Sequence, residues 1–350
     1  MTNGLVMSDQ KFLPFYERIA NRCGGEIVGR VVVSTLLGLA FLVPHYLGSW
    51  LVGKNVNDWS WFLGVLITTA MLCLYYATHT LETMLPEMNT RLGPKREDVY
   101  MPPIKEKLSD AKFIIAGIFF GSLNCGVGYL LGLPYLECPG VVTILIGYFL
   151  AGFVCGMAVL GIYGVFAPIK AYSVNARPSF DFTSPDHCGG TGFLGNALIV
   201  FGSVTLIVGV MISVYILKTH WKRTHTWWVI LIEGIWIIFP YICSLLALIA
   251  PAVPVNKQLR AYKIEEEIII RKRLTEIQKA LENQGGTPAD RKDLREDYEF
   301  QQNRRKDLHG MRTWPFALGA GLKYLSVVVV NLIAHVSAGA AKWLSAAIPS

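Results

Sequence analysis

Residues 227–249 read WWVILIEGIWIIFPYICSLLALI, an apolar run of 23 residues with a single charged side chain, Glu233. A bilayer core of about 30 Å needs about 20 helical residues, because each residue advances a helix by about 1.5 Å. The run is therefore long enough to cross a membrane as one helix. It predicts the fold class of the chain.

Five further runs share this length and composition. The six predicted spans are Val31–Val52, Trp59–Thr78, Phe113–Leu133, Val141–Phe166, Phe193–Leu217 and Trp227–Ile249. Only 16% of the 350 residues are charged, against about 25% in soluble domains. The sequence therefore predicts an all-α fold, a polytopic membrane helical bundle of six spans in a lipid bilayer.

Lys and Arg residues gather in the segments that lie on one side of such a bundle. A cytoplasmic N-terminus is favoured, because Lys and Arg collect on the cytoplasmic side. The inner segments then carry Lys11, Arg18, Arg22, Arg91, Lys95, Arg96, Lys105, Lys107, Lys170 and Arg177. The outer loop with Lys218, Lys222 and Arg223 opposes this trend. The net charge of +7 fits this excess of Lys and Arg in cytoplasmic segments, so no nucleic-acid partner is expected.

The N-terminus and the cysteines bear on the compartment. Charged residues are scattered through the first 26 positions, so no cleavable signal peptide is expected. The seven cysteines form no C-x-x-C motif, which argues against a disulfide framework. No N-x-[ST] sequon occurs, which fits a bacterial inner membrane.

The predicted domains follow the composition. Residues 1–30 are a cytoplasmic N-terminal segment, 31–250 the six-helix bundle and 255–312 a charged cytoplasmic helical hairpin. In the hairpin an apolar stripe steps by four, three and four residues, and Gly285-Gly286 ends the helix before Thr287-Pro288 starts the next. The stripe is Ile270, Leu274, Ile277 and Leu281. The hairpin charges predict a solvated face; a cytoplasmic protein partner or self-association through residues 256–312 is the alternative.

Residues 313–350 allow two interpretations. Apolar residues between Leu318 and Trp343 form one stripe, and polar residues such as Lys323 and His335 fall largely away from it. This pattern favours an amphipathic helix in the inner interface, and the alternative is a seventh span whose polar side faces other helices.

The loop SPDHCGGTGFLG, residues 184–195, contains a G-x-G-x-x-G match. A nucleotide site is excluded, because the glycines lead into a span and no acid follows about 20 residues later. Asp186, His187 and Cys188 are adjacent, which is a poor arrangement for a metal site. The start of a helix flanked by Gly189, Gly190 and Gly192 instead suits a docking point for an anion, a lipid headgroup or the hairpin, although plain helix packing is favoured.

The same loop resembles one found in a group of membrane proteins. Its pattern, Pro185-Asp186-x-x-Gly189-Gly190-x-Gly192-Phe-Leu, is similar to a loop of uncharacterised bacterial multi-pass membrane proteins. The resemblance covers about a dozen residues, implies the class and carries no activity with it.

Three polar residues lie inside predicted spans. Glu233 is an acid within a span, which makes it a functional candidate by default. Counting along the helices puts Glu233, His45 and Asn124 in the outer half of the bilayer, and Pro44 and Pro240 could break their helices nearby. One hypothesis is an ion or proton pathway with Glu233 as carrier and His45 as its partner. The alternative is a set of hydrogen-bonded groups in the bundle.

No enzyme motif accompanies these residues. The chain has no G-x-S-x-G, H-E-x-x-H or P-loop, and no cofactor or metal is expected. His79 and Glu82 are neighbours on a helix, but without a third ligand they read as surface groups. The sequence therefore favours a channel or transporter for a small ion or solute. A membrane scaffold or signalling component, which forms a homo-oligomer or binds a partner through the hairpin, is the alternative, and an enzyme ranks last.

Overall fold

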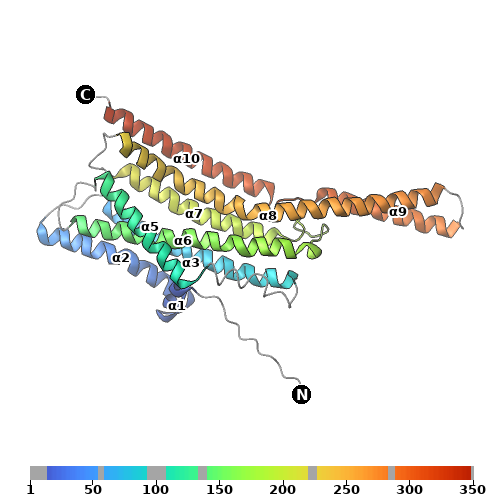
Figure 1. The fold of residues 1–350 in the computed structure, drawn as a ribbon, viewed down its shortest axis with the longest axis horizontal. Helices are drawn as coiled ribbons and strands as arrows, with labels where there is room; N and C mark the ends of the chain where they lie inside the picture. The colour runs from blue at the N-terminus through green and yellow to red at the C-terminus, as the bar shows by residue number, and fades with distance from the viewer. Residues whose placement is uncertain are drawn as a thin grey trace, which may run out of the picture.

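The computed structural model describes residues 14–53, 59–92, 108–132, 140–219, 227–282 and 288–347. Within these segments all regular structure is helical, and the long helices lie side by side in a bundle (Figure 1). The elements are α1 (Phe15–Arg22), α2 (Glu26–Val52), α3 (Ser60–Leu92), α5 (Asp110–Leu131), α6 (Gly140–Asn175), η2 (Arg177–Ser179), α7 (Gly192–Lys218), α8 (Trp227–Glu282), α9 (Pro288–Gly310) and α10 (Leu318–Ala347).

Seven of the described helices are long and apolar enough to cross a membrane, so the chain is a polytopic integral membrane protein. Six of them correspond to the six predicted runs, with ends that differ by a few residues, and the seventh is Gly319–Ala341 within α10. This length and composition fit the alternative interpretation of residues 313–350, in which the terminal helix is a seventh span.

α10 packs along the bundle, and two contacts with α8 fix its position. The hydroxyl of Tyr324 bonds with Ser244, and both side chains are buried. Further along, the hydroxyl of Tyr241 lies 2.7 Å from Nδ1 of His335. His335, one residue of the polar side, therefore faces α8.

Close packing of α5 against α6 depends on small residues. A Cβ atom at Gly152 would lie 2.5 Å from the carbonyl oxygen of Phe120, and one at Gly156 would lie 2.4 Å from that of Ala116. Such distances leave no room for a side chain. The two backbones approach closely because glycines lie at the crossing, as is common between membrane helices.

The prolines inside the spans do not end their helices. Pro44 lies within α2 and Pro240 within α8, so the predicted breaks are absent from both. α8 also continues through Pro251 and Pro254, which lie at the predicted boundary between bundle and hairpin. Neighbouring helices can satisfy the backbone carbonyls that a proline frees in a membrane helix.

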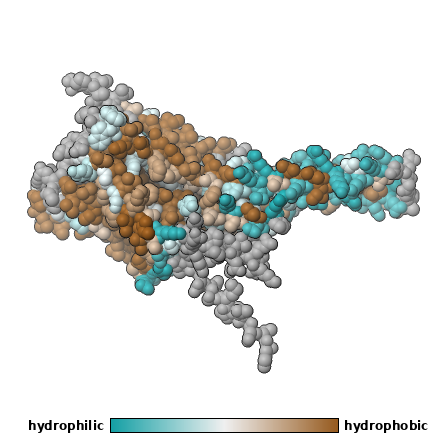
Figure 2. Space-filling view, viewed as in Figure 1, coloured by the Kyte–Doolittle hydropathy of each residue, from teal (hydrophilic) through white to brown (hydrophobic). Residues whose placement is uncertain are grey.

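α8 runs for 56 residues, so one helix contributes to both the bundle and the hairpin. We call residues 256–282 of α8 together with α9 the stalk. It projects from one end of the bundle, the stalk end (Figure 1). Its surface is hydrophilic where that of the bundle is hydrophobic (Figure 2). The two helices meet at a seam of buried residues that includes Ile270, Ile277 and Leu308.

Ion pairs fasten the stalk helices on both sides of this seam. Arg273 pairs with Asp297 at 2.9 Å and Arg304 with Glu266 at 3.4 Å. Arg305 and His309 both pair with Glu267. The predicted helix start at Thr287 and the outer loop with Lys222 and Arg223 lie outside the described residues.

Candidate functional site

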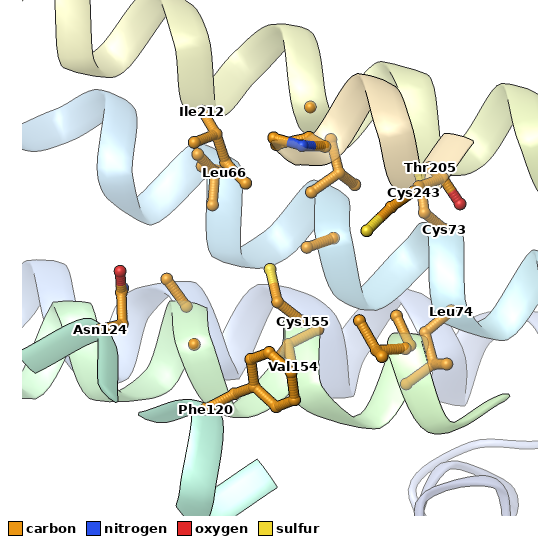
Figure 3. A pocket seen from close by; sticks show the side chains of 18 of the residues that line it. Leu66, Cys73, Leu74, Phe120, Asn124, Val154, Cys155, Thr205, Ile212 and Cys243 are labelled. Carbon is orange, nitrogen blue, oxygen red and sulfur yellow. The ribbon is translucent and has the colours of Figure 1, made fainter. Parts of the chain in front are cut away.

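A cavity of about 400 Å³ lies inside the bundle, between α3, α5, α6, α7 and α8. Its lining extends along α3 from Leu63 to Leu81, a distance of about 27 Å at the usual helical rise. That length is close to the thickness of a bilayer core. Figure 3 shows side chains from these helices pointing into the space between them.

The lining is apolar over most of this length. Leucine, valine, isoleucine and phenylalanine side chains predominate, and among the described lining residues none is charged. The polar exceptions include Thr78, Asn124, Thr205, Tyr148 and Tyr215, together with three cysteines from three helices, Cys73, Cys155 and Cys243. Cys155 and Cys243 direct their sulfur atoms into the cavity (Figure 3).

Asn124 is held at the cavity wall by a bond between helices. Its side-chain amide donates to the carbonyl oxygen of Tyr148 in α6 at 2.8 Å. The Tyr148 hydroxyl in turn lies 3.1 Å from that of Tyr215 in α7. A short polar network therefore links three helices at the end of the cavity that is distant from the stalk.

His45 and Glu233 are buried, and neither is among the described residues that line the cavity. His45 stacks on Phe41, and its Nδ1 atom lies 2.8 Å from the hydroxyl of Thr143 in α6. No hydrogen bond joins His45 to Glu233 in the described part of the chain, and Nε2 of His45 is buried without a partner. Of the three residues of the predicted pathway, only Asn124 borders the cavity.

The loop before α7 is organised around one carboxylate. Oδ1 of Asp186 accepts the backbone N–H groups of Cys188 at 2.8 Å and Gly190 at 3.0 Å, and Oδ2 accepts that of Gly192 at 2.8 Å. Burial by itself raises the pKa of Asp186, but these bonds outweigh it and hold the pKa below the ordinary value. The start of α7, where an anion was predicted, thus holds the negative charge of the chain's own side chain.

The loop backbone is tightly turned and touches two other segments. His187, Gly189 and Gly190 all have positive φ, at 53°, 64° and 82°. A Cβ atom at Gly190 would lie 2.2 Å from the guanidinium of Arg91, which stacks on Phe193. The carbonyl of His187 accepts the N–H of Arg312 at 2.7 Å. The loop therefore packs against the end of α3 and the connector between α9 and α10.

A second polar cluster, near the stalk end, unites α1, α2 and α3. The guanidinium of Arg30 lies 2.9 Å from Glu17, 3.4 Å from Glu26 and 3.9 Å from Glu82. Glu26, His79 and Glu82 place their potential ligand atoms within 4.8 Å of one another. The sequence offered no third potential metal ligand beside His79 and Glu82. The structure places Glu26 there, from a helix about 50 residues earlier in the chain. Arg30 already binds two of these carboxylates, so the cluster is an ion-pair network.

No family model, curated protein or solved structure matches the chain. The likeness of the loop to those of other multi-pass membrane proteins therefore stays a prediction.

Proposed function

We propose that the protein is a transporter that binds a long apolar molecule in the cavity of its membrane bundle. The lining of the cavity supports this most directly, because it is apolar over about 27 Å and its described residues carry no charge. Ligand pockets are typically apolar, have a few polar groups and enclose about 300–1,000 Å³. A molecule with an acyl-type chain matches both the length and the chemistry of this space.

A small hydrated ion fits this cavity less well. An ion would have to lose water without gaining charged or numerous polar partners, and that desolvation is costly. The ion or proton pathway through Glu233, His45 and Asn124 remains a separate prediction. It needs a route other than the cavity, since Glu233 and His45 are not among the described residues that line it.

We also propose that the stalk lies in the cytoplasm of a bacterial cell, with the bundle in the inner membrane. The bias of Lys and Arg toward this side supports that orientation. α1 and the start of α2 then lie on the same side as the stalk.

Two glycines provide a matched test of the cavity. A side chain added at Gly161 meets open space and enters the lining of the cavity. A side chain added at Gly126 also meets open space, but Gly126 lies on the exposed face of α5 and does not line the cavity. Gly161→Leu and Gly126→Leu therefore make the same chemical change at two comparable helical positions.

The experiment uses a fatty acid with a photoreactive diazirine on its chain, added to the purified protein in liposomes. Irradiation should attach the probe to cavity residues such as Phe120, Val127 and Phe239, and excess unlabelled fatty acid should compete. Gly161→Leu should lower the labelling several-fold, whereas Gly126→Leu should leave it unchanged. Equal labelling of both variants would show that the probe reports only bulk lipid, and would exclude the proposal.

A membrane scaffold is the second candidate function, and one observation favours it. The stalk exposes apolar side chains to water. Among them are Ile264, Ile268 and Ile269, whose side chains are 62%, 61% and 57% exposed. Scattered single exposures are ordinary, but three within six residues on a charged helix mark an interaction surface.

A further inference from the structure

The part of α8 in the stalk carries one exposed basic and apolar stripe. Its members are spaced by three, four, four and three residues, so they share one face of the helix. They are Lys257, Arg260, Ile264, Ile268 and Arg271, and all are exposed. We call this set the basic stripe.

α9 carries an exposed stripe of opposite charge. Its members are spaced by three, four, three and four residues, and Phe300 at its centre is 59% exposed. They are Asp293, Glu296, Phe300, Asn303 and Asp307, and all are exposed. We call this set the acidic stripe. Lys292 lies 3.8 Å from Glu296, an exposed ion pair of the kind that contributes little.

The ion pairs of the stalk show that the two stripes lie on opposite sides of it. Phe300 lies three residues after Asp297 and four before Arg304, so it shares the side of the seam marked by their pairs with Arg273 and Glu266. Ile264 lies three residues before Glu267, and Arg271 four after it, so the basic stripe follows the side marked by Glu267 and Arg305. Apolar patches stand out from the hydrophilic surface of the stalk in Figure 2.

The same ion pairs fix the heights of the residues along the stalk. Because Arg304 lies level with Glu266 and Asp297 with Arg273, Phe300 lies level with about residue 270 of α8. Phe300 is therefore within about 3 Å of the height of Ile268. By the same count, Glu296 and Arg271 differ in height by about 4.5 Å, and so do Asp307 and Arg260. All three differences have the same direction, so one small shift along the stalk would align the three pairs.

We propose that the basic stripe of one copy binds the acidic stripe of a second copy, so that the stalks of neighbouring molecules pair side by side. Copies in one membrane have the same orientation and depth. The apolar residues of the basic stripe therefore meet Phe300 of the acidic stripe, and each Arg of the basic stripe lies near an acid. The opposite charges argue for a second copy as the occupant, because each stripe is the complement of the other.

The geometry also sets the type of assembly. Because the stripes lie on opposite sides of the stalk, each copy has one donor face and one acceptor face, which makes the contact head-to-tail. Such contacts close into a ring when the rotation allows it. In one membrane the axis of that ring is perpendicular to the bilayer. This assembly deepens the scaffold function by naming its partner, and it does not depend on what the cavity binds.

Cysteine cross-linking of the full-length protein in liposomes tests the proposal. Copies with Ile268→Cys are mixed with copies with Phe300→Cys and treated with a short bifunctional thiol reagent, with the unsubstituted protein as background for the native cysteines. A cross-linked dimer should form in the mixture and not with either variant alone. The double variant should give a ladder that ends at the ring size. No dimer in the mixture, or a dimer with Ile268→Cys alone, would overturn the head-to-tail contact.

Charge reversal provides the second arm. Arg271→Glu should lower the yield of cross-linked dimer about tenfold, and adding Glu296→Arg to the partner should restore it. Arg295→Glu makes the same charge change at an exposed position of α9 that is not three or four residues from any member of the acidic stripe, and it should have no effect. Acyl-probe labelling of the same samples separates the two functions: loss of cross-linking with intact labelling overturns the assembly alone. Lack of rescue would show that the charges do not pair.

Discussion

The carboxylate of Glu17 lies 2.9 Å from Nε of Arg30, and this ion pair fastens α1 to the start of α2. The side chain of Glu17 is fully buried, and that of Arg30 is 12% exposed. Burial raises the pKa of Glu17, and the bond to Arg30 offsets part of the rise. Burying either charge alone would be costly, and the opposite charge of the partner reduces that cost. The pair therefore holds the N-terminal helix against the bundle.

Removing Arg30 should therefore be more harmful than removing both charges. Arg30→Met leaves the buried Glu17 without its partner, which costs about 3–5 kcal/mol for a buried pair. Adding Glu17→Gln should recover a large part of this loss, because no buried charge remains. Thermal unfolding in detergent measures both effects. Arg22→Met is the control, because Arg22 is at an exposed position of α1, and it should change the stability little. A double variant that is no more stable than Arg30→Met would contradict the argument.

The pH dependence of Glu17 follows from the same burial. Because its pKa is raised above the ordinary 4.5 in the folded protein, this group favours folding fully below 4.5 and loses that contribution as the pH rises through the raised pKa. Glu17→Gln should remove that part of the slope from a plot of stability against pH. An unchanged slope in the variant would assign the pH dependence to other groups.

Asp186 should show the opposite sign. Its pKa is lowered below the ordinary 3.8, so it stabilises the loop above that pH and loses its contribution as the pH falls below it. Asp186→Asn replaces one acceptor oxygen with a donor, which should cost about 1–3 kcal/mol and speed hydrogen exchange at the amides of Gly190 and Gly192. Asp181→Asn is the control, because among the described residues the carboxylate of Asp181 accepts hydrogen bonds from the exposed Thr183 alone.

The bond from Asn124 to the carbonyl of Tyr148 joins α5 to α6 inside the membrane. Asn124→Leu should cost about 0.6–2 kcal/mol, the range for hydrogen bonds between membrane helices, when unfolding is followed in a detergent titration. Asn331→Leu is the matched control, since Asn331 bonds back to Val327 of its own helix. Equal effects of the two substitutions would show that the contact between helices adds nothing.

Glu233→Gln separates the cavity from the predicted ion pathway. Labelling of the cavity should be unaffected, because Glu233 is not among the described residues that line it. The pathway hypothesis expects loss of proton or cation flux in proteoliposomes, with Glu276→Gln on the stalk as a neutral control. Unchanged flux would remove Glu233 from any pathway.

The spans were predictable because hydropathy and length suffice to recognise them. The seam of the stalk was predictable for a similar reason, since Ile270 and Ile277 repeat at the helical period and both are buried. The role of α10 was harder. Its polar residues resembled a water-facing side, and only the contact of His335 with Tyr241 shows that part of that side faces another helix.

The sites were less predictable because they depend on which helices are neighbours. Nothing local in the sequence brings Glu26 to His79, or Cys73 to the same cavity as Cys155 and Cys243. Asp186 is the exception. It is close in sequence to the start of α7, and its carboxylate accepts the first N–H of that helix.

The continuity of α8 has a mechanical consequence. Trp236, Phe239 and Cys243 of this helix border the cavity, and the same helix continues into the stalk without interruption through Pro251 and Pro254. The stalk portion of α8 is about 40 Å long. A tilt of about 5° at the bundle would therefore displace the tip of this lever by about 3 Å. A change of side-chain packing deep in the membrane would thus be amplified at a surface that water and other proteins can reach.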